Sequence, residues 1–304
     1  MHHSWFPDPV PGMLHCKGML TYIQAIILGS LQGIAELFPI SSLGHSIILP
    51  GVFGWGIDES APFFLMFLVA THFATAIVLF LFFWKDWMRI IGGVLRSFVA
   101  RDVSVSDDAR LGWLLIISTI PAGILGLLFQ DHIRAYFVSA GSAAFFLVAN
   151  GVLLWGAEIL RRRASVSGGA DAVASDARIA RLSWRKGILV GTMQALALIP
   201  GFSRTGASLA GGLVAGLSHE DALRFSFLLA TPIIGAAALL KLPELAMEGG
   251  GAVSISVAGA VFAAFFAFLS VKFLTRYFET ERRTLMPFAI YCAAAGALAL
   301  LIIR

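Results

Sequence analysis

Six stretches of this chain are apolar over about the 20 residues that a helix needs to cross a bilayer. A backbone in lipid must satisfy its hydrogen bonds within its own segments, which leaves only helices and closed barrels. Because these stretches lack the alternating pattern of barrel strands, we predict helices. The predicted spans are Pro62 to Phe83, Leu111 to Phe129, Tyr136 to Leu160, Leu223 to Leu242, Gly251 to Val271 and Leu285 to Ile303.

The overall composition agrees with a membrane protein. Of the 304 residues, 58% are hydrophobic and 13% are charged, and the mean hydropathy is +0.86, whereas a soluble domain averages about 25% charged residues. The formal net charge is +4, but basic residues in such a chain set orientation and contact anionic lipid, so no nucleic-acid partner is expected. Cys16 and Cys292 have no spacing typical of disulfides or metal ligands.

Two further apolar regions are interrupted by polar and helix-breaking residues. The first, about Leu20 to Phe53, is broken at Pro39 to Gly44, and the second, about Gly187 to Leu217, is broken at Pro200 to Gly206. The arms of the second region are too short to cross a bilayer, which predicts a re-entrant helical hairpin. The first region is predicted to be a hairpin because its residues recur in the second at one constant spacing. Gly29, Gln32, Ala35, Ser41 and Gly44 are matched by Gly191, Gln194, Ala197, Ser203 and Gly206.

The chain is therefore predicted to be an all-α, polytopic membrane protein built from two repeats, residues 19–160 and 187–304. Each repeat is one re-entrant helical hairpin and three transmembrane helices, and three crossings make the topology inverted. Residues 1–18 are predicted to be a disordered extension, and residues 161–186 a cytoplasmic linker that is flexible over 163–181. Most of the 22 Lys and Arg residues follow the first, third and fifth spans, which predicts that both termini lie outside.

Polar side chains in the first hairpin indicate chemistry rather than packing. Gln32 and Glu36 are four residues apart and share one helix face, where their oxygens suit Mg²⁺ or Ca²⁺. Ser41 and Ser42 stand where the second helix needs its N-cap. His45 is a candidate general acid or base, or a phosphoryl acceptor, and Ser42 is a candidate nucleophile that His45 would activate.

The second hairpin carries features of an anion site. Arg204 offers a planar guanidinium at a helix N-terminus, and Ser203 and Ser208 can donate hydrogen bonds, so a phosphate group fits best. The alternative for Arg204 and Glu36 is a buried structural pair, and the alternative for Ser203 is a simple N-cap. His72, in the first predicted span, has no partner in the sequence pattern and is predicted to be structural.

Two segments carry a resemblance to a known family. QGIAELFPISSLGH at Gln32 to His45 and QALALIPGFSRTGASLAGGL at Gln194 to Leu213 resemble the signature motifs of the undecaprenyl-diphosphate phosphatase family, of the bacitracin-resistance type. The similarity extends from about Tyr22 to the C-terminus. It implies a plasma-membrane hydrolase that converts undecaprenyl diphosphate to undecaprenyl phosphate and inorganic phosphate during lipid carrier recycling for cell-wall synthesis, with a divalent cation and an outward-facing site.

The resemblance also implies roles for single residues. The catalytic candidates are Glu36, Ser42, His45 and Arg204. The resemblance implies substrate binding by Ser203, Arg204 and Ser208, and the further substrate-binding candidates in the two segments are Ser41, Gln194 and Thr205. Gln32 and Glu36 are the metal candidates, and Gln32 stands where many members have a first glutamate, which places more weight on Glu36.

The resulting expectation is a membrane phosphatase acting on a polyprenyl diphosphate lipid, with a homodimer left open. Ser42, His45 and water remain alternative nucleophiles. A polyprenyl-phosphate flippase or secondary transporter of similar architecture, and a non-catalytic scaffold, are the rival interpretations. We further expect Glu36, His45 and Arg204 to share one pocket, because the first hairpin lacks a cation and the second lacks a carboxylate.

Overall fold

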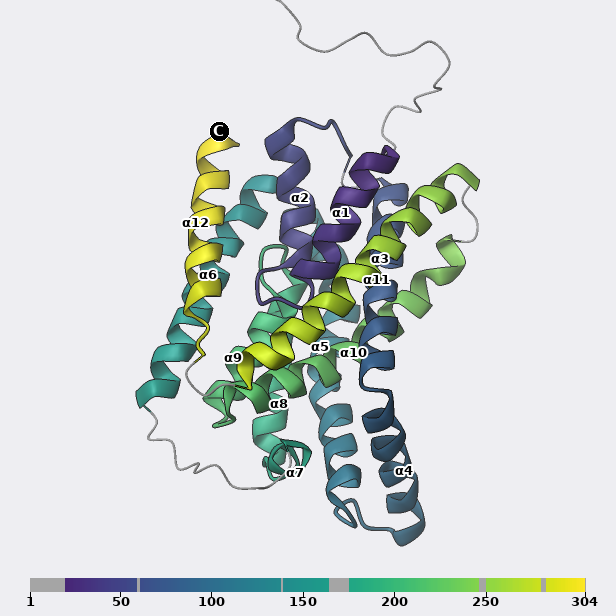
Figure 1. The fold of residues 1–304 in the computed structure, drawn as a ribbon, viewed down its shortest axis with the longest axis vertical. Helices are drawn as coiled ribbons and strands as arrows, with labels where there is room; N and C mark the ends of the chain where they lie inside the picture. Colours follow the sequence, from purple (N-terminus) through teal and green to yellow (C-terminus); the bar gives the residue numbers. More distant parts are fainter. Residues whose placement is uncertain are drawn as a thin grey trace, which may run out of the picture.

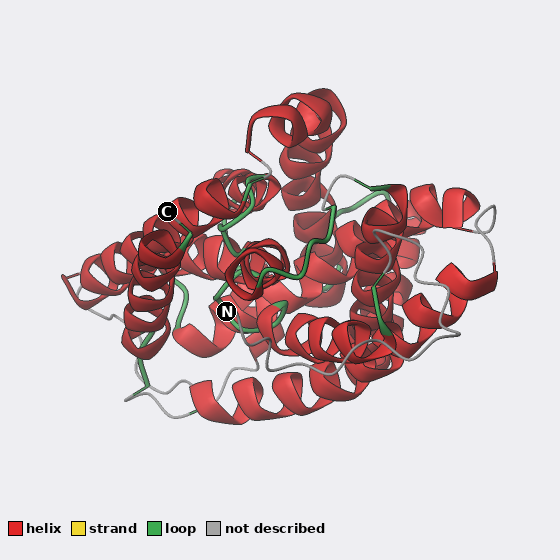
Figure 2. Cartoon of the chain, turned by 90° about the horizontal axis from the view of Figure 1, so that it is seen from above, coloured by secondary structure: helices red, strands yellow, loops and turns green. Residues whose placement is uncertain are grey.

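The computed structural model describes residues 20–58, 61–137, 139–163, 175–245, 250–279 and 283–303. These residues form helices and contain no β-strand (Figure 2). The helices are α1 (Tyr22–Ala35), α2 (Ser42–Phe53), α3 (Pro62–Phe82), α4 (Trp84–Ala100), α5 (Asp107–Phe137), α6 (Ala140–Arg163), α7 (Ser175–Ala180), α8 (Trp184–Gln194), the 3₁₀ turn η1 (Ala195–Leu198), α9 (Arg204–Val214), α10 (His219–Leu245), α11 (Gly250–Phe278) and α12 (Met286–Ile302). The predicted extension at residues 1–18 lies outside the described residues.

Five of these helices are long and apolar enough to cross a membrane: α3, α5 over Asp107–Phe129, α6, α10 over His219–Lys241, and α11 over Gly251–Phe278. The sixth predicted span is the apolar helix α12, which has 17 residues. Many large apolar side chains on these helices are exposed, among them Leu81, Leu127, Val261, Phe265 and Leu301. Surface of this kind is stable in lipid rather than water, so the chain is a multi-pass membrane protein.

The two broken regions each form a pair of short helices around an irregular segment. In the first, residues 36–41 separate α1 from α2, and in the second, residues 199–203 separate η1 from α9. Each second helix begins with a serine cap, because Ser41 accepts a hydrogen bond from the Gly44 N–H and Ser203 accepts one from the Gly206 N–H. The predicted helix, break and helix are confirmed in both regions.

The two breaks lie against each other in the middle of the molecule (Figure 1). Glycine allows the close approach, since a Cβ on Gly44 would come within 2.9 Å of the Gly201 Cα atom. Gly201 itself has φ of +105°, a conformation that favours glycine. The pairs also contact the opposite halves of the chain, because α1 packs against α11 and α8 packs against α5. The start of α1 and the end of α12 lie at the same end of the molecule (Figure 1).

The segment between the first and second predicted spans contains a helix. The segment after the first span forms α4, which carries Asp86 and Arg89 on one side and exposes Leu95 and Phe98 on another. The segment between α4 and α5 is short, because α5 already begins at Asp107. Composition alone missed α4 because its apolar face is too narrow for a spanning segment and its charged residues resemble a loop. The predicted start of the third span at Tyr136 was also displaced, since α5 continues to Phe137 and α6 begins at Ala140.

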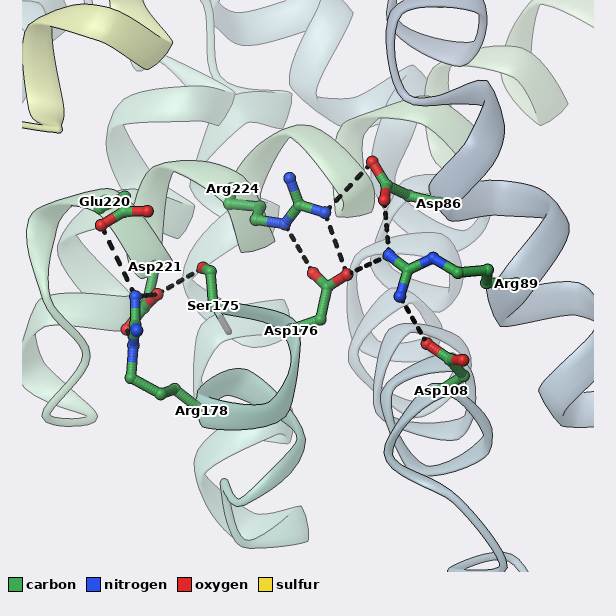
Figure 3. Close-up of polar contacts among 9 residues, drawn as sticks. All are labelled: Asp86, Arg89, Asp108, Ser175, Asp176, Arg178, Glu220, Asp221 and Arg224. Carbon is green, nitrogen blue, oxygen red and sulfur yellow. Dashed lines mark hydrogen bonds and ion pairs between the residues drawn. The ribbon is translucent and has the colours of Figure 1, made fainter. Parts of the chain in front are cut away.

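The predicted flexible linker is wrong over residues 175–180, which form α7, while residues 164–174 lie outside the described part. Ion pairs hold α7 between α10 on one side and α4 on the other (Figure 3). Asp176 accepts hydrogen bonds from Arg224 Nε at 2.6 Å and from Arg89 Nη2 at 2.8 Å. Arg178 Nε donates to Asp221 Oδ2 at 2.8 Å. These partners come from distant parts of the chain, so the local composition of the linker does not reveal them.

Burial raises the pKa of Asp176, but the hydrogen bonds and charges of Arg224 and Arg89 outweigh burial and hold that pKa below its ordinary value. The hydrogen bond with Asp86 is the main cause of a raised pKa at Arg89. Asp176 is only 7% exposed, and the lowered pKa keeps its carboxylate ionised at neutral pH. The ion pairs of this carboxylate therefore connect α7 to α4 and α10.

Candidate active site

A small pocket lies where the two breaks meet. Its polar lining comes from both helix pairs and from α3: Glu36, Ser42, His72, Ser203 and Arg204. Its apolar lining is Ala35, Leu43, Ala197 and Phe202. The structure therefore brings together a carboxylate, two hydroxyls, an imidazole and a guanidinium, of which all but the imidazole of His72 were predicted site groups.

Glu36 is the centre of the polar contacts in this pocket. The carboxylate is buried, and its Oε2 accepts hydrogen bonds from Ser42 Oγ at 2.5 Å and from Gln32 Nε2 at 3.2 Å. His72 Nε2 lies 3.2 Å from the same oxygen. Arg204 Nε lies 3.9 Å from Oε1. The contact between Ser42 and Glu36 has the geometry of a nucleophile beside a general base.

Arg204 is placed to bind an anion. It is the first residue of α9, which begins after the Ser203 cap, so its guanidinium shares the positive end of that helix. Its Nε is buried and makes no hydrogen bond to any other described residue. Glu36 Oε1 is 3.9 Å from this Nε, too far for a hydrogen bond. The N–H groups of the guanidinium can therefore donate to phosphate oxygens, whose geometry matches the planar guanidinium.

Asn150 holds the two breaks in register, and sequence reasoning missed it. Its side chain on α6 is buried; Nδ2 donates to the Pro39 carbonyl at 2.9 Å, and Oδ1 accepts from the Ser203 N–H at 3.1 Å. An uncharged asparagine in a predicted span was the only available signal, and a buried amide at membrane depth has to find partners of this kind.

Several predicted substrate-binding residues face protein rather than the pocket. Thr205 Oγ1 donates to the main-chain carbonyl of Glu36 at 2.8 Å. Ser208 Oγ donates to the Arg204 carbonyl at 2.7 Å and contacts Ser226 Oγ at 2.6 Å. The Ser41 side chain caps α2, and Ser41 has a strained φ of 69° for a non-glycine residue. Gln194 is buried, and neither atom of its amide group has a hydrogen-bond partner among the described residues.

His45 does not line the pocket that contains Glu36 and Arg204. Its Nδ1 contacts the Ser41 carbonyl at 2.7 Å, and its Nε2 contacts Tyr291 Oη at 2.9 Å. The expectation of a pocket shared by Glu36, His45 and Arg204 is therefore met for Glu36 and Arg204 and is wrong for His45 in this conformation. The expected hydrogen bond between Ser42 and His45 is replaced by the one from Ser42 to Glu36.

His72 is the pocket residue that the sequence interpretation treated as structural. It lies on α3, far from both motifs in the sequence, and only the packing of α3 beside α1 brings it to Glu36. The one available signal was an ionisable side chain inside a predicted span, which is costly without a partner.

The described residues contain no group of three or more His, Cys, Asp or Glu side chains that could hold a metal ion. Glu36 and His72 are a pair of this type, and Gln32 lies beside them with a buried Oε1 that accepts no hydrogen bond from the described residues. A free amide oxygen, a carboxylate and an imidazole are donors that fit a divalent cation.

The fold and the pocket together define a class: a polytopic helical membrane protein with a buried site suited to a phosphate group. The chain belongs to the family described as Bacitracin resistance protein BacA, whose model matches residues 25–298.

Curated relatives are similar over nearly their full length. A protein of Mycolicibacterium paratuberculosis named "Undecaprenyl-diphosphatase" is 46% identical, over 92% of this chain and 97% of that protein. A protein of Frankia alni and one of Chromobacterium violaceum, each named "Undecaprenyl-diphosphatase 2", are 42% and 43% identical over 92% of this chain, and over 97% and 98% of their own lengths. The resemblance identified from the two motifs is confirmed.

Proposed function

We propose that this protein is an integral membrane phosphatase that hydrolyses undecaprenyl diphosphate to undecaprenyl phosphate and inorganic phosphate. The observation that carries the proposal is the single pocket in which Glu36 and Ser42 of the first helix pair face Ser203 and Arg204 of the second. The names of the relatives supply the substrate. They also favour hydrolysis over the flippase alternative.

The geometry favours Ser42 as the nucleophile and Glu36 as its base. Ser42 Oγ attacks the terminal phosphorus, its proton passes to Glu36, and the bond to the bridging oxygen breaks so that undecaprenyl phosphate leaves. Water then attacks the phosphoserine, the bond between Ser42 Oγ and phosphorus breaks, and Glu36 returns its proton to Oγ. Inorganic phosphate leaves with one hydrogen of the water, and the other is lost to solvent. Arg204 and the N-terminus of α9 bind the phosphate oxygens and stabilise the charge that develops there.

A divalent cation, Mg²⁺ or Ca²⁺ in the expectation from sequence, would be held by Glu36 and Gln32. When bound, the cation would neutralise charge on the diphosphate. The carboxylate has about four lone-pair sites, so Glu36 can accept the Ser42 hydrogen bond and bind a cation together.

The membrane arrangement that we propose is an inverted-topology repeat, with α1 and α2 re-entrant from outside and α8 and α9 re-entrant from the cytoplasm. Three features support it: the recurring motif, the exchange in which α1 packs on α11 while α8 packs on α5, and the meeting of the two breaks in the middle of the molecule (Figure 1). The distribution of Lys and Arg supports an arrangement with both termini outside. The family supports a site that opens outward from the bacterial plasma membrane. The prenyl tail would lie between apolar helices.

The test is phosphate release from undecaprenyl diphosphate by protein purified in detergent, with and without a chelator. We expect release by the wild type, its loss on chelation, and a decrease of at least about 100-fold in Glu36→Gln and Arg204→Ala. A rapid quench followed by mass spectrometry should find phosphate on Ser42. A well-folded protein that releases none contradicts the proposal, and a quench that labels neither Ser42 nor His45 would assign the attack to water.

A further inference from the structure

Two histidines near the breaks, His45 and His72, have the same kind of partner at Nδ1 and different partners at Nε2. Nδ1 of His45 lies 2.7 Å from the Ser41 carbonyl, and Nδ1 of His72 lies 2.7 Å from the Leu68 carbonyl. Because a carbonyl oxygen only accepts, Nδ1 carries the hydrogen in both rings. In a neutral ring, Nε2 then presents a lone pair.

The partner of that lone pair differs between the two rings. Nε2 of His45 meets the hydroxyl of Tyr291 at 2.9 Å, and a hydroxyl can donate, so the contact is satisfied by a neutral ring. Nε2 of His72 meets Glu36 Oε2 at 3.2 Å. An ionised carboxylate has no hydrogen to donate, so a neutral His72 leaves two acceptors facing each other. The contact becomes favourable when His72 carries a second proton, which makes an ion pair, or when a metal ion binds both atoms.

The amide oxygen of Gln32, next to this pair, has no hydrogen-bond partner among the described residues. Oε1 of Gln32 is buried and accepts no hydrogen bond from any described residue, while the amide nitrogen of the same group donates to Glu36 Oε2. A buried acceptor left unpaired costs about 1–3 kcal/mol. Gln32 on α1 and His72 on α3 thus both contact Glu36, whose Oε2 also accepts a hydrogen bond from Ser42 Oγ.

We propose that His72 Nε2 is a nitrogen ligand of the divalent cation, together with the Glu36 carboxylate and Gln32 Oε1. This inference rests on the proposed function for the presence of the cation and adds the ligand that the two motifs do not contain. Neighbouring ligands in an octahedral site, each about 2.1 Å from the ion, are about 3.0 Å apart. The distance of 3.2 Å between His72 Nε2 and Glu36 Oε2 fits such a pair.

The ligand set has a consequence for the choice of ion. Ca²⁺ prefers oxygen ligands throughout, whereas first-row divalent ions also accept imidazole. One imidazole with one carboxylate and one amide oxygen therefore favours Mn²⁺ over Ca²⁺. His72 thus acts as a determinant of ion selectivity for this site.

The test measures coordination directly, with Mn²⁺ as the probe in full-length protein reconstituted in nanodiscs. Electron spin echo envelope modulation detects nitrogen bound to Mn²⁺, and His2, His3 and His15 are replaced by Ala to remove the tail imidazoles. We expect nitrogen modulation in this background and its loss in His72→Gln, with Mn²⁺ binding weakened at least tenfold and Ca²⁺ binding changed less than threefold.

Two matched variants report on other imidazoles. His219→Gln removes the other His and Glu pair, in which Glu158 Oε2 lies 2.8 Å from His219 and is also bonded by the Leu285 N–H. His45→Gln removes the second imidazole near the breaks. Both should keep the nitrogen modulation.

The inference is overturned if the folded background protein binds no Mn²⁺, if bound Mn²⁺ shows no nitrogen modulation, or if the modulation survives in His72→Gln. Phosphate release is measured on the same samples, so the two proposals fail separately. Chelator-sensitive hydrolysis without nitrogen modulation would contradict only the proposal that His72 is a ligand. Nitrogen modulation without hydrolysis would contradict only the proposed phosphatase function.

Discussion

Thr205 Oγ1 of the second helix pair donates a hydrogen bond of 2.8 Å to the main-chain carbonyl of Glu36 in the first. Both residues are buried. The bond fixes the backbone that carries the central carboxylate from the opposite half of the chain, so the position of Glu36 depends on both pairs.

The first prediction concerns this bond. Thr205→Val keeps the shape of the side chain but leaves the Glu36 carbonyl without its donor, which should cost about 1–3 kcal/mol and lower phosphate release. Thermal unfolding and initial rates in detergent measure the two effects. Thr205→Ser should restore both, and Thr192→Val, which removes a hydroxyl that bonds within its own helix, should change neither. An unchanged rate in Thr205→Val would show that this bond does not position Glu36.

The second prediction concerns Asn150. Asn150→Ala removes both the bond to the Pro39 carbonyl and the bond to the Ser203 N–H, so the two breaks lose their shared partner. We expect a larger fall in kcat than Thr205→Val gives, because two buried groups are left unpaired. Cys292→Ser is the matched control, since Cys292 Sγ contacts the Pro39 carbonyl at 3.7 Å and Asn150 Nδ2 at 3.3 Å, and the exchange leaves both Asn150 bonds to the breaks in place. If Cys292→Ser were as damaging as Asn150→Ala, loss of packing rather than loss of register would be the cause.

The third prediction separates His45 from its tyrosine partner. General acid or base catalysis contributes about 10²- to 10⁴-fold, so His45→Ala should lower phosphate release at least tenfold if His45 turns toward the substrate. Tyr291→Phe removes only the hydroxyl that binds Nε2 and should change the rate by less than about threefold or raise it. Steady-state rates of phosphate release by both variants test whether His45 takes part in catalysis. A fully active His45→Ala enzyme would show that His45 is not a catalytic residue.

The fourth prediction concerns pH and the ion pairs around α7. The pKa of Asp176 in the folded protein is below its ordinary value of 3.8. Its carboxylate therefore contributes stability that is fully present above pH 3.8 and is lost as pH falls through the lower folded pKa. The difference in stability between wild type and Asp176→Asn should be largest at neutral pH and shrink in acid.

Thermal unfolding in detergent between pH 7 and pH 3 measures that difference. Asp107→Asn is the matched control, because Asp107 is exposed and makes no ion pair with another described residue. The control should change stability little at any pH. A constant difference for Asp176→Asn across the range would exclude a contribution from its charge.

The sequence by itself determined the features that depend on residues adjacent in the chain and on the surrounding lipid. Apolar runs of spanning length predicted α3, α6, α10 and α11, because lipid leaves a polar backbone no other partner. The serine caps at Ser41 and Ser203 followed from local rules for helix N-termini. The repeated motif located the two breaks and, with them, Glu36, Ser42, Ser203 and Arg204.

What only the tertiary structure decided are contacts between residues far apart in the chain. His72 faces Glu36 because α3 packs beside α1, and His45 turns to Tyr291 because α12 passes α2. Asn150 acquired its role only when α6 brought its amide between Pro39 and Ser203. Side-chain hydrogen bonds depend on positions within a fraction of an ångström, and the folding of both halves around one pocket sets those positions.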